Sequence, residues 1–200
     1  MGDDQTFRIV LAIGMLAILP IAIYRRVRSQ QTGESLDRWQ EGPFILFTLR
    51  PLGIAAMLSV LAFVINPAWM AWSSVPLPAW LRWIGVVLGA IGGALLVWTL
   101  KHLGENLTDT VVTRQKHTMI MTGPYAYVRH PFYVSAALAF LANSLVMANW
   151  FVFVTGGLAF ALLVLRCRTE EAKLIERFGD AYRDYMRRTG RFVPRVGVKP

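Results

Sequence analysis

The chain has 200 residues, of which 55% are hydrophobic and only 16% are charged, and its mean hydropathy is +0.45. Soluble domains carry about 25% charged residues, so this composition excludes an ordinary soluble protein and indicates a membrane protein. The single cysteine excludes both an intramolecular disulfide framework and a cysteine-based zinc cluster.

Five apolar stretches are long enough, or nearly long enough, to cross a bilayer as a helix, which takes about 20 residues. We therefore predict an all-α integral membrane protein with five transmembrane helices, three of them within residues 1–100. The last two stretches are short and are separated only by the region around Asn149, which is typical of a tight helical hairpin. The predicted spans are residues 7–24, 43–65, 79–100, 132–148 and 150–165.

The third predicted span contains a regular series of glycines. Gly85, Gly89 and Gly93 recur every four residues, so they lie on one face of the helix. Small residues at this spacing allow a second helix to approach closely. We expect this face to pack against another helix, either within the bundle or in a second protomer.

The positions of Lys and Arg predict the orientation in the membrane. Segments 25–42, 101–131 and 166–200 hold almost all of the 21 basic residues, whereas segment 66–78 has no charge and two tryptophans. Because cytosolic loops carry an excess of Lys and Arg, we predict an outside N-terminus and a cytosolic C-terminus. The membrane expected is the inner or plasma membrane of a prokaryote. Topology and attraction to anionic lipids then explain the net charge of +9, and no nucleic-acid partner is expected. The exceptions are Arg8, Arg50 and Arg82.

The C-terminal tail is expected to form one cytosolic helix over residues 168–188. Its apolar side chains recur at steps of three and four, and basic residues cover the other face, as in a helix that lies on a membrane or closes over a bundle. Gly190 is expected to end it. The apolar positions include Ala172, Ile175, Phe178, Tyr182, Tyr185 and Met186.

Several polar side chains converge at the predicted cytosolic end. Arg129 and His130 immediately precede the fourth span, while Arg166 and Glu170 are four residues apart and therefore share one helix face. The histidines are too far apart in sequence for a compact metal site, and we predict none. The sequence has no dinucleotide-binding glycine motif, P-loop or nucleophile elbow, so no Rossmann domain is expected. These residues alone leave open a ligand site or a set of topology-determining charges.

Two linked motifs at this end resemble a known family. The first is HTMIMTGPYAYVRHPFY (117–133), and the second is RCRTEEAKLIERFGDAYRDY (166–185), followed by RFVP (191–194). The chain from about residue 100 to its end is similar to the isoprenylcysteine carboxyl methyltransferases and the related phospholipid methyltransferases. The first two spans match only as hydrophobic helices.

The resemblance implies an S-adenosylmethionine-dependent membrane methyltransferase that binds its methyl donor on the cytosolic side without a Rossmann domain. Residues 101–200 would form the catalytic region. Arg166 and Glu170 would be catalytic, and Arg166 and Arg129 would bind the substrate. The donor-binding residues implied are His117, Thr118, Met119, Ile120, Tyr125, His130, Pro131, Tyr133, Glu170 and Glu171.

The acceptor implied by the resemblance is a lipophilic or lipid-modified molecule with an isoprenylcysteine-type carboxylate, which enters from the surrounding membrane lipids. Phe132 stands where many carboxyl methyltransferases have serine, so a phospholipid amine or a small thiol remains an alternative acceptor. A related membrane reductase that binds NADPH, and a membrane scaffold or transport component, are less favoured alternatives. The sequence does not define the oligomeric state.

Overall fold

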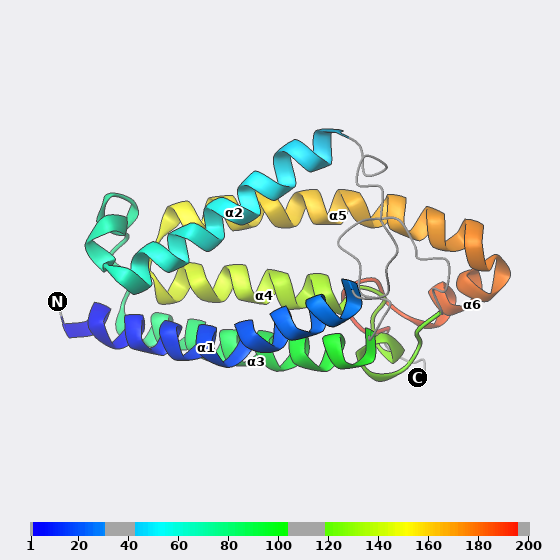
Figure 1. The fold of residues 1–200 in the computed structure, drawn as a ribbon, viewed down its shortest axis with the longest axis horizontal. Coiled ribbons are helices and arrows are strands. Elements are labelled where there is room, and N and C mark those ends of the chain that lie inside the picture. Colours follow the sequence, from blue (N-terminus) through cyan, green and yellow to red (C-terminus); the bar gives the residue numbers. More distant parts are fainter. Residues whose placement is uncertain (1, 31–42, 104–118, 196–200) are drawn as a thin grey trace.

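The computed structural model describes residues 2–30, 43–103 and 119–195 of the chain. Within these ranges the structure contains helices and two isolated bridges between single residues, and no β-strand. The long helices lie side by side in an elongated bundle (Figure 1). The predicted all-α fold is therefore confirmed.

Four of the described helices, α1, α2, α3 and α5, are long and apolar enough to cross a membrane, whereas α4 has only 16 residues. The chain is thus an integral membrane protein by helix length and composition, and the count of five spans stays a prediction. The described elements are α1 (Gly2–Gln30), α2 (Pro43–Ile65), η2 (Pro67–Ser73), α3 (Ala79–Leu103), η4 (Gly123–Ala126), α4 (Pro131–Val146), α5 (Trp150–Phe178) and α6 (Asp180–Arg188), where η marks a 3₁₀-helix.

The tail differs from the single helix predicted over residues 168–188, and that prediction was wrong. Helix α5 continues without a break from the apolar stretch to Phe178, and the chain then bends at Gly179 before α6 begins. Gly179 has a φ of 55° and a ψ of −130°, a conformation that is strained for any residue with a side chain. The glycine therefore separates the two helices and lets α6 turn away from the α5 axis (Figure 1).

The glycines of α3 pack within the bundle. A Cβ atom on Gly85 would lie 2.8 Å from the Cβ atom of Leu145 in α4, and one on Gly92 would also collide with α4. Gly89 makes an ordinary contact with the same helix, whereas Gly93 faces α1. The predicted close approach is confirmed for α4, although the glycine stripe against α4 includes Gly92 in place of Gly93.

The helical hairpin predicted around Asn149 is confirmed, and its turn lies against η2. The Asn149 side chain caps α5 by accepting from the Val152 amide at 3.1 Å. Its amide nitrogen donates to the Ser73 hydroxyl at 2.7 Å and to the Met70 carbonyl oxygen at 3.3 Å. The α4–α5 turn, η2 and the start of α1 thus share one end of the bundle, called here the η2 end; α6 marks the opposite, α6 end (Figure 1).

Candidate functional site

The segment before α4 brings polar residues to the α6 end. Gly123 adopts a φ of 62° and is followed by Pro124, so the chain turns there and forms η4. The backbone then runs beside the C-terminal segment, residues 189–195. The Arg129 amide donates to the Gly190 carbonyl oxygen at 2.9 Å, and the His130 amide donates to that of Arg191 at 3.1 Å.

Glu171 is the centre of a buried ion-pair network. Its side chain is 5% exposed, and its Oε1 atom accepts from Arg129 Nε at 2.9 Å. His130 Nε2 lies 3.3 Å from the same oxygen, and the Arg191 guanidinium donates to both carboxylate oxygens. The contact with Glu171 also raises the pKa of Arg191. Glu171 therefore ties α5 to the start of α4 and to the C-terminal segment.

Arg129 connects this network to the C-terminal end of α6. Besides Glu171, its guanidinium donates to the carbonyl oxygens of Met186, at 3.2 Å, and Thr189. These carbonyls lie at the C-terminal end of α6, where a cation is favourable because it satisfies free acceptors and offsets the helix dipole. The substrate-binding role predicted for Arg129 stays a prediction, and the partners that the structure gives to Arg129 are protein groups.

Glu170 belongs to a second polar cluster, on the side of α5 that faces α4. Its Oε1 atom accepts from the Tyr133 hydroxyl at 2.7 Å and from Arg166 Nε at 3.0 Å, so the predicted pair of Arg166 and Glu170 is present. Its Oε2 atom lies 3.7 Å from His130 Nδ1, beyond hydrogen-bonding distance. The His130 and Tyr133 rings stack with centroids 5.3 Å apart. His130 thus stands between the two adjacent carboxylates of α5.

An aromatic cavity of about 70 Å³ adjoins these clusters. The Tyr185 hydroxyl donates to the Tyr125 carbonyl oxygen at 2.7 Å and links α6 to η4 across it. Burial raises the pKa of Tyr125, and it raises that of Tyr185 to about 12, so both phenols stay neutral at physiological pH. The lining residues are Leu103, Met119, Ile120, Tyr125, Arg129, Leu174, Phe178, Tyr182 and Tyr185.

An apolar wall flanks the Glu170 cluster on the side of α2. Tyr133, Leu163 and Cys167 form a buried group, and Leu49 of α2 and Phe192 of the C-terminal segment pack against it. Cys167 is fully buried, as a packing residue would be. The Glu170 cluster is therefore bordered by buried apolar side chains on the side of α2.

The structure brings most of the predicted site residues together. Met119, Ile120 and Tyr125 line the aromatic cavity, while His117 and Thr118 lie outside the described residues. Within the described parts of the chain, no group of three or more metal-ligating side chains occurs. The remaining predicted residues, His130, Pro131, Tyr133, Arg166, Glu170 and Glu171, lie at the start of α4 or on the facing part of α5.

Sequence reasoning missed two contributions from the C-terminal segment. Arg191 pairs with Glu171, and the Thr189 carbonyl oxygen accepts from Arg129. The motif RFVP marked this segment, but a motif alone does not reveal which carboxylate its arginine meets. Of the two arrangements considered for the tail, lying on the membrane or closing over the bundle, the second agrees with Tyr182 and Tyr185, which line the cavity.

The fold and these clusters define a class of protein, a helical membrane protein with a charged and aromatic site at one end of its bundle. Residues 83–176 match the model of the isoprenylcysteine carboxyl methyltransferase (ICMT) family, which confirms the resemblance predicted from the motifs. A solved structure described as the eukaryotic intramembrane Ras methyltransferase ICMT aligns with 96% of this chain and 70% of that chain, with a TM-score of 0.59. At 20% identity this match shows the shared fold.

Two of three curated relatives of the chain are named as methyltransferases. The chain is 30% identical over 113 residues to protein-S-isoprenylcysteine O-methyltransferase of Schizosaccharomyces pombe, covering 53% of this chain and 46% of the relative. It is 31% identical to cobalt-zinc-cadmium resistance protein CzcN of Cupriavidus metallidurans, over 64% of this chain and 53% of the relative. It is 26% identical to methanethiol S-methyltransferase of Mycobacterium tuberculosis, over 78% of this chain and 56% of the relative. The chain thus spans about half the length of these relatives.

Proposed function

We propose that the chain is an S-adenosylmethionine-dependent membrane methyltransferase whose acceptor is a lipophilic molecule with an isoprenylcysteine-type carboxylate. The observation that carries this proposal is the cluster of Arg166, Glu170 and Tyr133 beside an aromatic cavity, inside the region that matches the family. We place the α6 end in the cytosol because the basic residues concentrate in the segments at this end.

The side chains at the α6 end fit a cationic methyl donor. Neutral, buried phenol rings attract cations through their faces, and Tyr125, Tyr182 and Tyr185 present such rings to the cavity. The Glu170 carboxylate adds a negative charge near them. Burial, and to a smaller extent this charge, raise the pKa of the Tyr125 phenol. The cavity of about 70 Å³ is smaller than a typical ligand pocket of 300–1,000 Å³, so these residues would hold one part of the donor.

The donor, when bound, supplies an electrophilic methyl group on a sulfonium, and the chain's own residues position the acceptor. Arg166 would neutralise and aim the acceptor carboxylate, because Glu170 holds the Arg166 guanidinium at 3.0 Å and is itself fixed by the Tyr133 hydroxyl. Methyl transfer is an in-line displacement that depends on alignment and on exclusion of water. The apolar wall formed by Leu49, Leu163 and Phe192 would exclude water and receive the lipid part of the acceptor.

A small thiol is the second candidate acceptor, because one relative is the methanethiol S-methyltransferase of Mycobacterium tuberculosis. A thiol, like a phospholipid amine, must lose a proton before or during methyl transfer, whereas a carboxylate is already ionised. Glu170 Oε2 would accept that proton, since no hydrogen bond joins it to His130 Nδ1 at 3.7 Å. The two acceptor classes therefore differ in whether Glu170 acts as a base.

Calorimetry on the purified protein in detergent tests the donor. We expect S-adenosylmethionine to bind and NADPH not to bind, and binding of NADPH alone would overturn the proposal in favour of a reductase. Labelled donor is then mixed with a farnesylcysteine analogue or with methanethiol, and the product is identified by mass. A base-labile methyl ester supports the carboxylate acceptor, and a thioether supports the thiol. Arg183→Ala, at an exposed position on α6, is the control variant for folding and handling.

A further inference from the structure

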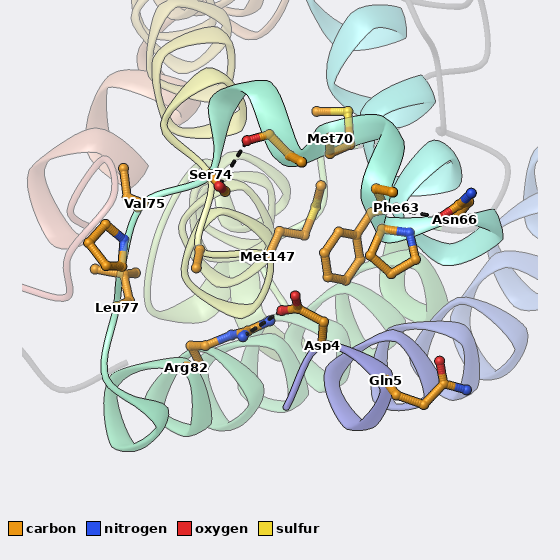
Figure 2. A pocket seen from close by; sticks show the side chains of 15 residues that line it. Asp4, Gln5, Phe63, Asn66, Met70, Ser74, Val75, Leu77, Arg82 and Met147 are labelled. Atoms are coloured by element: carbon orange, nitrogen blue, oxygen red, sulfur yellow. Dashed lines mark hydrogen bonds and ion pairs between the residues drawn. The ribbon is translucent and has the colours of Figure 1, made fainter. Parts of the chain in front are cut away.

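A second, larger cavity of about 640 Å³ lies at the η2 end of the bundle (Figure 2). The start of α1, the end of α2, η2, the following segment, α3 and the α4–α5 turn all contribute to its lining. Its volume falls within the range of small-molecule pockets. Apolar Phe63, Met70 and Met147 face polar Asp4 and Arg82 across it (Figure 2). The lining therefore suits a ligand that has a polar and an apolar part.

Arg82 supplies a buried positive charge with unused hydrogen-bond donors. Its side chain is 7% exposed; Nε donates to the Val146 carbonyl oxygen at 2.9 Å, and Nη1 donates to Asp4 Oδ1 at 2.8 Å. Its Cζ atom also lies 4.0 Å from the centroid of the Phe7 ring. Nη2 is buried and has no hydrogen-bond partner among the described residues. A buried polar atom left without a partner costs about 1–3 kcal/mol, so this group calls for an acceptor.

The two ionisable side chains of the lining, Asp4 and Arg82, differ in how strongly water screens their charges. Asp4 is 54% exposed, so water screens its charge, whereas the charge of Arg82 acts in a low-dielectric surrounding. Figure 2 shows the Arg82 side chain extending below Met147 toward Asp4, with which it pairs. The cavity therefore favours a ligand that is negatively charged near Arg82. A guanidinium fork suits the geometry of phosphate and carboxylate oxygens.

The tryptophans of the η2 end indicate the depth of this cavity in a membrane. Trp69, Trp72, Trp80 and Trp150 all expose between 45% and 63% of their surface around it. Exposed tryptophans gather at the level of the lipid headgroups, where their rings meet both hydrocarbon and water. At that level the phosphate group of phospholipids is the most abundant anion. This depth argues for a lipid source of the ligand.

We propose that the η2-end cavity binds the phosphate of a phospholipid headgroup, with Arg82 as its principal ligand and Asp4 as a competing carboxylate. The phosphate would pair with the guanidinium in place of Asp4 and supply the acceptor that Nη2 lacks. The apolar residues Phe63, Met70 and Met147 would contact the part of the lipid next to the headgroup. This site lies at the end of the bundle opposite the methyl-transfer site and does not depend on the proposed activity.

Native mass spectrometry of the purified protein, titrated with phosphatidylglycerol, tests the proposal through two variants that act in opposite directions. Arg82→Gln should weaken binding of the lipid about ten- to a hundredfold, because it removes a charge-assisted contact. Asp4→Asn should strengthen binding several-fold, because it removes the competing carboxylate. A structural defect would not produce a gain, so Asp4→Asn remains decisive even if the Arg82 variant folds poorly.

Matched controls come from the exposed ion pair of Arg183 and Asp180 on α6. Substitutions at this pair change the net charge by the same amount, but at the other end of the bundle. Arg183→Gln and Asp180→Asn should leave phosphatidylglycerol binding unchanged. Diacylglycerol, which lacks the phosphate, should bind at least tenfold more weakly. Unchanged lipid affinity in the Arg82→Gln or Asp4→Asn variant overturns the proposal. Displacement of the lipid by an equal concentration of inorganic phosphate overturns it in favour of a free-anion site.

Discussion

The adjacent carboxylates Glu170 and Glu171 should respond differently to the same substitution. Glu171 is 5% exposed and accepts from the buried Arg129 guanidinium and from Arg191. Glu171→Gln therefore leaves Arg129, whose side chain is 8% exposed, without its carboxylate. Breaking a buried ion pair from one side costs about 3–5 kcal/mol. Because Arg129 keeps two carbonyl acceptors, we expect the lower end, a loss of about 3 kcal/mol in the free energy of unfolding.

Glu170→Gln should spare stability and damage donor binding. Glu170 is 20% exposed, and an amide oxygen at this position still accepts from Tyr133 and Arg166. Because both hydrogen bonds survive the substitution, the loss in the free energy of unfolding should be about 1 kcal/mol, smaller than for Glu171→Gln. The loss of the negative charge should nevertheless weaken the affinity for S-adenosylmethionine at least about tenfold, because a contact to a charged group is removed.

Two measurements on the same preparations separate the roles of these carboxylates. Titration with SDS in mixed micelles gives the free energy of unfolding, and calorimetry gives the dissociation constant of the methyl donor. Glu176→Gln, at an exposed position of α5, serves as the control for both. Equal losses of stability in Glu170→Gln and Glu171→Gln would refute the reasoning, as would an unchanged donor affinity in Glu170→Gln.

Three further variants test the acceptor side, the aromatic cavity and the helix packing. Arg166→Ala should lower turnover at least about tenfold while the donor dissociation constant changes less than about twofold, and unchanged turnover would remove Arg166 from the acceptor site. Tyr185→Phe deletes the hydrogen bond to Tyr125 and should lower the free energy of unfolding by about 1 kcal/mol in SDS titrations, whereas no loss would contradict a stabilising role for this bond. Gly85→Val should cost about 1–3 kcal/mol because a Cβ atom there already collides with α4, while Gly157→Ala, with open space around it, should not destabilise.

Most of the fold was readable from hydropathy, but the ends of the helices were not. The apolar stretch 7–24 marks only the part of α1 that suits lipid, and the hydrogen-bonded helix extends over Gly2–Gln30. The break at Gly179 escaped detection because the three- and four-residue periodicity of the tail continues across it. Hydrophobic periodicity reports which face of a helix is apolar, and it is insensitive to a single residue that changes the direction of the axis.

The candidate site was predictable where its contacts are local in sequence. The pair of Arg166 and Glu170 follows from their spacing of four residues, and the structure contains it. The contacts of Glu171 with Arg129 and Arg191 span 42 and 20 residues, and they depend on how the chain returns after α6. No local pattern encodes that return, so the sequence named Glu171 as a site residue without revealing that its partners are protein cations.

The pairing of two consecutive carboxylates follows from helix geometry. Successive residues on an α-helix point about 100° apart, so Glu170 and Glu171 face different neighbours from one turn of α5. Glu171 faces Arg129 and Arg191, which hold the C-terminal segment in place, while Glu170 faces Tyr133 and Arg166. A single carboxylate could not neutralise the structural cations and also keep an oxygen available to a ligand. The second acidic residue therefore separates the charge that the fold requires from the charge proposed to serve the reaction.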